Sequence, residues 1–212
     1  VLGSLVDPMT VGQTGIQQQL GVARFDELRL LLQQALETEE ALRNVGSQEL
    51  GIIAQGVASA AEILAQNYTL VVTNVPYLVR GKHNQSLMRF CDRNYSESKA
   101  DLSTAMLERI LHFLSHEGTT AAVVPQNWMF LTSYAQLRKT LLLKYRWDFL
   151  ARLGVGAFQT ITGEVVNVGL LAMSHATPGR THGFFALDAS VKSSPTEKAL
   201  QLQEAPNQCF LQ

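Results

Sequence analysis

The chain has 212 residues, of which 46% are hydrophobic and 17% are charged, and its formal net charge is −1. This composition predicts one sizeable globular domain or most of one. It argues against a free-standing nucleic-acid-binding module, which usually carries a basic excess. No apolar run reaches the roughly 18 to 20 residues of a membrane span, and no signal-peptide pattern is visible. Two distant cysteines, Cys91 and Cys209, fit a reducing compartment, so we expect a cytoplasmic protein without a membrane partner.

The N-terminal third predicts irregular chain followed by two helices. Residues 1–23 have no clear hydrophobic period and contain several glycines. Residues 25–43 place leucines on one helical face, and residues 47–66 form a second helix whose alanines suit close packing.

The hydrophobic period then changes from helical to strand-like. Residues 68–73 (YTLVVT) form a β-branched run typical of a buried parallel strand. A polar loop or short helix follows over 78–97, and then a strong helix over 99–116. Gly118 is the left-handed stop expected just past that helix, before a second buried strand over 119–124.

The C-terminal part predicts one more helix and three strands. The helix covers 131–145, and the strands cover 147–153, 165–173 and 183–187. The tail, residues 191–212, is polar and is expected to be loosely ordered.

This alternation of helices and strands favours a three-layer α/β fold, in which a mostly parallel sheet carries helices on both faces. We expect residues 24–190 to form that domain. Ligands of such sheets bind at the carboxyl ends of the strands. The segments 74–77, 125–128 and 154–158 each follow a predicted strand, so they are expected to converge on one edge of the sheet.

The segment Asn74-Val75-Pro76-Tyr77 is the most informative short motif. An amide, a proline-stiffened turn and an aromatic ring follow one another directly off a strand. The amide oxygen can accept a hydrogen bond from a planar amino group while the ring stacks on its plane. The alternative is an ordinary turn at a strand end, since Asn and Pro are common turn residues.

The surrounding sequence resembles the N6-adenine DNA methyltransferases. Residues 65–77 (AQNYTLVVTNVPY) are similar to their (Asp/Asn/Ser)-Pro-Pro-(Tyr/Phe) motif, with Val75 replacing the first proline. Further similar segments follow in family order over residues 60–173; they are Lys99–Leu102, Leu107–Arg109, Gly118–Trp128, Leu137–Arg138, and Leu153–Phe158 with Val165–Leu171. The likeness is strongest to type IIG restriction-modification methylases and to the PglX-like methyltransferases of BREX phage defence.

The resemblance implies a partial Rossmann-like, S-adenosylmethionine-dependent methyltransferase fold and assigns roles to the motif. Asn74 Oδ1 and the carbonyl of Val75 would accept hydrogen bonds from adenine N6, and Tyr77 and Phe158 would sandwich the flipped base. Pro76 stiffens the turn. Without the first proline we expect a floppier loop. Phe158 could instead be a simple core residue.

The family binds S-adenosylmethionine through a glycine-rich loop and an acidic residue, both upstream of the motif. Residues 1–67 contain no strand followed by such a loop. Asp101 and Leu102 resemble a family motif that contributes to the cofactor pocket. The alternative is that Asp101 only caps its helix. The resemblance therefore implies the C-terminal half of a catalytic domain, inactive alone and bound to DNA through the full-length enzyme.

Two rival functions and two weaker sites stay open. The motif also serves methyl transfer to a protein glutamine, and a degenerate, non-catalytic methyltransferase-like module is a second rival. His112 and His116 have the spacing of metal ligands but lack a third ligand, so we expect no metal. The loop after Tyr77 is locally basic and either contacts phosphates or is solvated; its basic residues are Arg80, Lys82, His83, Arg89 and Arg93.

Overall fold

The computed structural model describes residues 3–8, 45–158, 166–204 and 208–212, and the chain divides into two units, Val1–Gln66 and Asn67–Gln212. In the first unit a 3₁₀ turn, η1 (Gly3–Leu5), and the helix α2 (Val45–Ala65) are described. Helix α2 confirms the second predicted helix. The helix predicted over 25–43 and most of the segment 1–23 lie outside the described residues.

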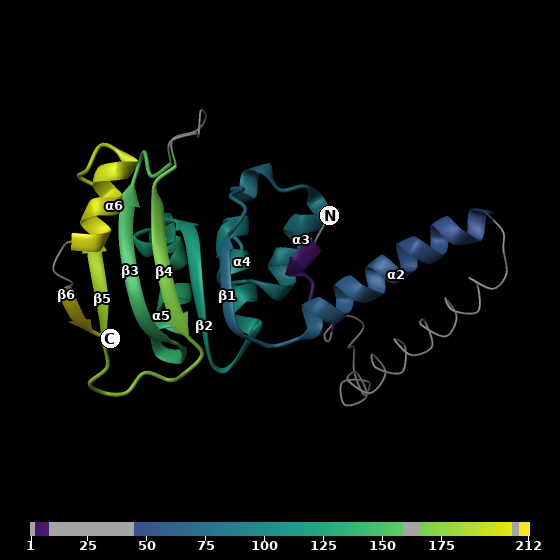
Figure 1. Cartoon of the computed structure of the whole chain (residues 1–212), viewed down its shortest axis with the longest axis horizontal. Helices are drawn as coiled ribbons and strands as arrows, with labels where there is room; N and C mark the ends of the chain where they lie inside the picture. The colour runs from purple at the N-terminus through teal and green to yellow at the C-terminus, as the bar shows by residue number, and fades with distance from the viewer. Residues whose placement is uncertain (1–2, 9–44, 159–165, 205–207) are drawn as a thin grey trace. The chain divides into compact units, whose positions relative to one another are not determined.

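The second unit is built on one six-stranded sheet with the order β1-β2-β4-β3-β5-β6 (Figure 1). The strands are β1 (Tyr68–Asn74), β2 (Leu114–Pro125), β3 (Arg146–Gly154), β4 (Val168–Ser174), β5 (Gly183–Asp188) and β6 (Gln208–Leu211). The first five correspond to the strands predicted from apolar runs.

The sheet is mixed, so the prediction of a mostly parallel sheet is wrong. β1 pairs with β2 and β3 pairs with β5 in parallel, but the pairs β2–β4, β3–β4 and β5–β6 are antiparallel. β4 runs against both of its neighbours. The hydrophobic period indicates that a strand is buried but not which way it runs, and buried strands of either direction read as continuous apolar runs.

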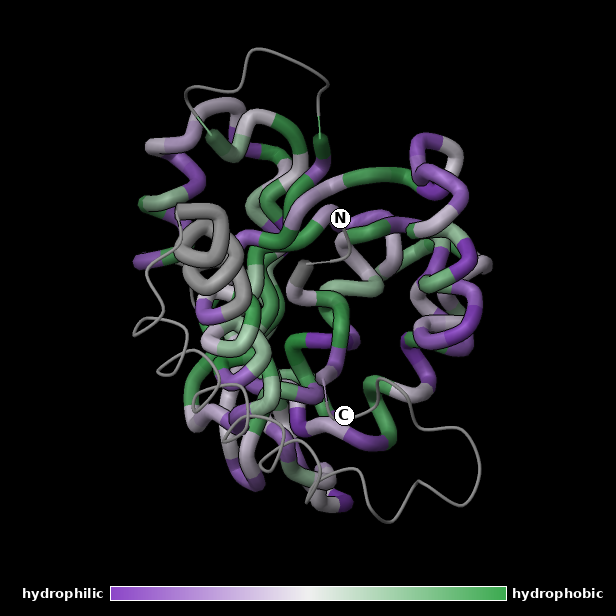
Figure 2. Tube along the Cα trace, turned by 90° about the vertical axis from the view of Figure 1, so that its right-hand side faces the viewer, coloured by the Kyte–Doolittle hydropathy of each residue, from purple (hydrophilic) through white to green (hydrophobic). Residues whose placement is uncertain are grey.

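Helices cover one face of the sheet and part of the other. They are α3 (Gln85–Asn94), α4 (Leu102–His112), α5 (Ala135–Lys144) and α6 (Pro195–Glu204), with short 3₁₀ turns η3 (Arg80–Lys82), η4 (Gln126–Met129) and η5 (Thr132–Tyr134). In Figure 2 the hydrophobic stretches of this unit run along the strands, and hydrophilic stretches occupy outer turns.

Two apolar clusters lie on opposite faces because side chains alternate along each strand. The first cluster joins β2 and β4 to α4 and α5, and includes Val75, Leu107, Leu111, Val124, Leu137, Leu141, Leu171 and Met173. The second cluster consists of Ala151, Leu153, Val168 and Ala189, with Ala157 and Leu202 of α6 packed against it. Helices therefore pack against both faces of the sheet, α4 and α5 on one and α6 on part of the other.

The strands β1, β2, β3 and β5 run in one direction, so their carboxyl ends meet at one edge of the sheet. The segments 74–77, 125–128 and 154–158 leave the sheet at this edge. The predicted convergence of these three segments is confirmed.

Strand β2 begins earlier than predicted, at Leu114, because α4 ends at His112. The left-handed residue is Glu117 (φ 62°), within the first residues of β2, whereas Gly118 is not left-handed. A Cβ on Gly118 would lie 2.8 Å from the carbonyl oxygen of Tyr68, so glycine is needed here for space. The prediction that Gly118 is a left-handed helix stop is therefore wrong.

The outer edge of β1 pairs with no other strand of the described residues. On the face of β1 away from the first cluster, Leu70 and Val72 are 60% and 69% exposed, so the strand is correctly predicted but its burial is not. Native proteins seldom leave an apolar edge strand with one face exposed to solvent.

The C-terminal tail differs from its expected loose order. Residues 191–212 contain α6 and β6, and β6 pairs with β5. The described residues contain no helix long and apolar enough to cross a membrane. They also contain no cluster of three or more His, Cys, Asp or Glu side chains that could hold a metal ion.

Candidate functional site

Asn74 is the last residue of β1, and Val75 continues the pairing by one hydrogen bond. The Val75 amide donates to the carbonyl of Val123 on β2 over 3.4 Å. The Val75 side chain is 3% exposed and belongs to the first cluster. Proline has no amide hydrogen, so this bond exists only because valine replaces it. The loop expected to be floppier is instead held by burial and by a strand-like hydrogen bond.

Asn74 and Tyr77 contact each other directly. The Tyr77 hydroxyl donates to Asn74 Oδ1 over 3.3 Å. Burial raises the pKa of Tyr77, so the hydroxyl is protonated at neutral pH and acts as a donor. An amide oxygen has two lone pairs, so one acceptor position on exposed Asn74 is left for a ligand. The Tyr77 ring packs partly against the first cluster, which fixes its plane.

Asp101 and Leu102 hold the residue that follows Tyr77. The Leu102 amide donates to the Leu78 carbonyl over 2.8 Å, and the Leu78 amide donates to Asp101 Oδ1 over 3.4 Å. Asp101 Oδ1 also accepts from the Ser103 amide (2.8 Å) and hydroxyl (2.7 Å) as the N-cap of α4. The structure thus joins the motif loop to α4 and gives Asp101 a structural role, that of helix cap.

His83 supports the same loop, a contact that sequence reasoning missed. Its side chain is 6% exposed, and Nε2 lies 2.9 Å from the Leu78 carbonyl oxygen. Nothing in the spacing of His83 signals this contact, whereas the Asp-x-Ser pattern at 101–103 is a readable capping signal. His83 is therefore an internal support rather than a phosphate contact.

Arg80 is likewise engaged within the protein. Its guanidinium forms an ion pair with Asp92 at 2.8 Å, and Lys99 approaches the same carboxylate at 3.1 Å. The hydrogen bond from Arg80, followed by that from Lys99, lowers the pKa of Asp92. These pairs tie η3 and α3 together beside the motif loop.

Phe158 lies beyond the end of β3, on the same edge as the motif, and its side chain is partly exposed. β2 and β4 separate β1 from β3, so the strand ends are about 14 Å apart at the usual strand spacing. The structure therefore brings Phe158 to the edge without a described bond to Asn74 or Tyr77.

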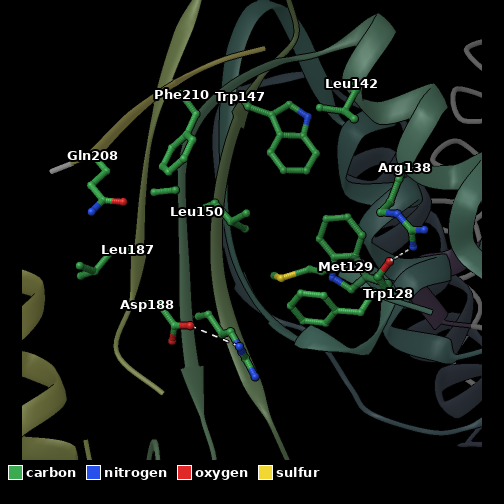
Figure 3. Close-up of a pocket in the computed structure, with 13 residues that line it drawn as sticks. Trp128, Met129, Arg138, Leu142, Trp147, Leu150, Leu187, Asp188, Gln208 and Phe210 are labelled. Carbon is green, nitrogen blue, oxygen red and sulfur yellow. Dashed lines mark hydrogen bonds and ion pairs between the residues drawn. The ribbon is translucent and has the colours of Figure 1, made fainter. Parts of the chain in front are cut away.

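A cavity of about 370 Å³ lies elsewhere, between α5 and η4 on one side and β3, β5 and β6 on the other (Figure 3). Its lining includes Trp128, Met129, Trp147, Leu150 and Phe210. None of the predicted site residues lines it. The chemistry of the motif therefore belongs to the sheet edge and not to this cavity.

The described residues do not form a site for S-adenosylmethionine. Before β1 they comprise η1 and α2, so no described strand precedes the motif to carry a cofactor loop. Asp101 Oδ1 accepts three hydrogen bonds as a cap and loop anchor. We therefore assign no cofactor contact to the described residues.

Comparisons with known proteins show where this fold is found. The chain is similar to the DNA-bound Type ISP restriction-modification enzyme LlaBIII over 74% of its length and 13% of that chain, with a TM-score of 0.58 and 13% identity. It is similar to DrdV in its DNA complex over 73% of its length and 18% of that chain, with a TM-score of 0.54 and 14% identity. The mixed α/β fold is thus one found in restriction-modification enzymes.

The model of the Eco57I restriction-modification methylase family matches residues 17–157, which is more than half of the chain. The chain belongs to this family. Two curated relatives are the adenine-specific methyltransferases PglX of Lacticaseibacillus casei (strain Zhang), 38% identical over 105 residues, and BrxX of Escherichia coli O9:H4 (strain HS), 41% identical over 106 residues. The matches cover 49% and 50% of this chain, but only 8% and 9% of the relatives.

Proposed function

We propose that this chain is part of an N6-adenine-specific DNA methyltransferase of a restriction-modification or phage-defence system. The observation that carries the proposal is the pairing of an exposed amide, Asn74, with the partly buried ring of Tyr77 at the carboxyl end of β1. Family membership and the similarity to the adenine-specific methyltransferases PglX and BrxX support the same substrate.

The motif would orient a poor nucleophile. The lone pair of adenine N6 is delocalised into the ring, so acceptors facing the amino group favour a more tetrahedral nitrogen. Asn74 Oδ1 and the Val75 carbonyl would be those acceptors, and their contribution is orientation and electrostatics. S-adenosylmethionine, when bound, supplies an electrophilic methyl group.

Aromatic side chains would hold the base outside the duplex. Flipping a base costs a few kcal/mol of stacking and pairing, part of which new stacking in the enzyme offsets. We assign this stacking to Tyr77, whose plane is fixed by the first cluster, and to Phe158. The acceptor left on Asn74 then faces the amino group at the edge of the stacked base.

The activity belongs, in this proposal, to a longer protein, since the chain covers under a tenth of PglX and BrxX. DNA would be bound by that full-length enzyme, in the cytoplasm, and the main S-adenosylmethionine loop would lie upstream of β1. We expect the 212 residues alone not to methylate DNA.

The test is transfer of labelled methyl groups from S-adenosylmethionine by the full-length protein to adenine-containing DNA. Asn74→Ala should lower kcat by about a hundred- to a thousandfold, the loss typical of removing one group that stabilises the transition state. Asn94→Ala, on exposed α3, is the matched control and should be unchanged. Activity of Asn74→Ala equal to that of the wild type would overturn the assigned role.

The same assay separates the rival functions. A glutamine-containing peptide offered in place of DNA would accept the label if the substrate were a protein. A degenerate module would bind DNA without transferring label to either substrate. Either result would contradict the proposal.

A further inference from the structure

Lys198 of α6 is a buried lysine that links the end of β3 to the chain leading into α6. The segment 154–158 that follows Leu153 is called the Phe158 loop. The Lys198 side chain is 2% exposed. Nζ donates to the carbonyl of Leu153 over 2.7 Å, to that of Ala189 over 3.2 Å, and to that of Lys192. Burying an ammonium group is costly unless it is hydrogen-bonded, so these carbonyls and the ammonium fix one another's positions.

Two glycines fit the loop against the chain that leads to α6. Gly154 and Gly156 are both left-handed, with φ of 66° and 67°. A Cβ on Gly154 would lie 2.8 Å from Ser190 Cβ, so Ser190 packs directly over it. The Ala189 amide also donates to the Arg152 carbonyl over 2.8 Å. The end of β3 is therefore in close contact with residues 189–190.

The second half of the segment 154–158 is held by apolar packing. Ala157, the residue before Phe158, packs against the second cluster, as does Leu202 of α6. Lys198 and Leu202 lie four apart, on the same helical face. One face of α6 therefore supports the loop at Leu153 through a charge and helps bury the cluster on which Ala157 rests.

The N-terminus of α6 is itself fixed by reciprocal hydrogen bonds. The Glu197 amide donates to Ser194 Oγ over 3.2 Å, and Glu197 Oε2 accepts from the amides of Ser194 (3.1 Å) and Ser193 (3.2 Å). This is a capping box, and it sets the direction in which α6 starts. Lys198, the next residue, is thereby aimed at the sheet.

We propose that Lys198 is a positioning residue for the Phe158 loop, so that α6 sets where the stacking ring stands at the edge of the sheet. The inference rests on the proposed function for the role of Phe158. Lys198 would not touch the base. It would act through the Leu153 carbonyl, four residues before Ala157.

The first experiment measures hydrogen–deuterium exchange in the 212-residue chain. Lys198→Met keeps the stem of the side chain but loses the ammonium, and should speed exchange of residues 154–158 by about tenfold or more through local opening. Exchange in α4 should be unchanged. The matched control is Lys192→Met, because the Lys192 side chain is exposed. Unchanged exchange in residues 154–158 would overturn the proposal.

A milder variant covers the case in which Lys198→Met does not fold. Glu197→Ala removes the capping box at an exposed position. It should accelerate exchange of the same peptide by a smaller factor. If Glu197→Ala loosens α6 yet leaves residues 154–158 protected, α6 does not hold the loop.

The second experiment uses the full-length methylase with two duplexes. One keeps the target adenine and measures methyl transfer, and the other carries 2-aminopurine at that position and measures only fluorescence, because 2-aminopurine has no amino group at C6. Lys198→Met should lower kcat by roughly ten- to a hundredfold, as a displacement of about 1 Å can, with KM for S-adenosylmethionine unchanged. The fluorescence of the flipped base should rise because Phe158 no longer quenches it, and Phe158→Ala should show the same rise. A loss of kcat in Lys198→Met without a change in fluorescence would contradict positioning.

The two experiments distinguish failure of the stacking role from failure of the positioning role. If Phe158→Ala changes neither kcat nor fluorescence, the stacking role in the proposed function is wrong, while the exchange result still decides whether Lys198 holds the loop. If Phe158→Ala has both effects and Lys198→Met has neither, the stacking role stands and the positioning role is wrong.

Discussion

The loops after β1 and β3 leave the same edge of the sheet and each carries an aromatic residue, but they are held by different means. The loop after β1 is held by main-chain bonds and a helix cap, through Leu78, Asp101 and Leu102. The loop after β3 is held by two left-handed glycines and by the buried ammonium of Lys198.

The support of the β1 loop is spread over several residues, whereas the support of the β3 loop depends on a few. The β1 loop shares its restraint among several hydrogen bonds, each contributing about 1 kcal/mol. The β3 loop depends on a few positions where only one residue type fits. Single substitutions should therefore affect the β3 loop more strongly.

The largest effect on stability is expected at Gly154. Gly154→Ala forces a left-handed alanine against Ser190 and should lower the free energy of unfolding by about 2–3 kcal/mol. The midpoint of urea unfolding measures it. Gly81→Ala is the control, since a Cβ there meets nothing within 4 Å. Equal midpoints for the two variants would show that the β3 loop is not the stricter of the two.

Substitutions of Asp101 test the support of the β1 loop, because this residue both caps α4 and accepts a hydrogen bond from Leu78. Asp101→Ala removes the N-cap and should lower the free energy of unfolding by about 1–2 kcal/mol, whereas Asp101→Asn keeps an acceptor and should be near neutral. Thermal unfolding measures both. If Asp101→Asn is stable but the full-length protein loses methyl transfer, the carboxylate has a role beyond capping.

Val75→Pro restores the residue typical of the motif and should have a smaller effect. It loses the amide bond to Val123, worth about 1 kcal/mol, and restricts the unfolded chain, which offsets roughly 0.4–1 kcal/mol. We expect the free energy of unfolding to change by less than about 1 kcal/mol and methyl transfer to stay within about threefold. A loss larger than that of Asp101→Ala would show that the valine amide dominates this loop.

Asp92 should give the smallest effect, and one that depends on pH. Its folded-state pKa is lowered by Arg80 and Lys99, so the pair adds stability above the ordinary carboxyl pKa and loses it as pH falls through the folded value. Asp92→Asn should therefore flatten the decline of the melting temperature below about pH 4. High salt should shrink the difference between Asp92→Asn and wild type, because the pair is partly exposed to solvent. A salt-independent difference would point to a buried interaction instead.

The sequence predicts the strands and the edge on which they end, because apolar β-branched runs such as 68–73 differ from helical patterns. It does not predict the direction of β4, since burial on both faces looks the same either way. Nor does it predict α6. Lys198 reads as a surface residue, and only the carbonyls gathered around it from Leu153, Ala189 and Lys192 explain its burial.

Glycines show the same limit. Gly118 is needed for space beside Tyr68, while Gly154 and Gly156 are needed for their left-handed backbone. A single letter in the sequence does not distinguish these reasons. The motif at Asn74–Tyr77 was readable because it is local, and the support from His83 was not, because it depends on a fold in three dimensions.

The bare edge of β1 has a practical consequence for work with the chain in isolation. Its outer hydrogen-bonding groups meet no other described strand, and Leu70 and Val72 stand exposed beside them. Such an edge is a template on which a second molecule can add a strand. Concentrated samples should therefore be colloidally unstable, and light scattering against concentration should precede any spectroscopy.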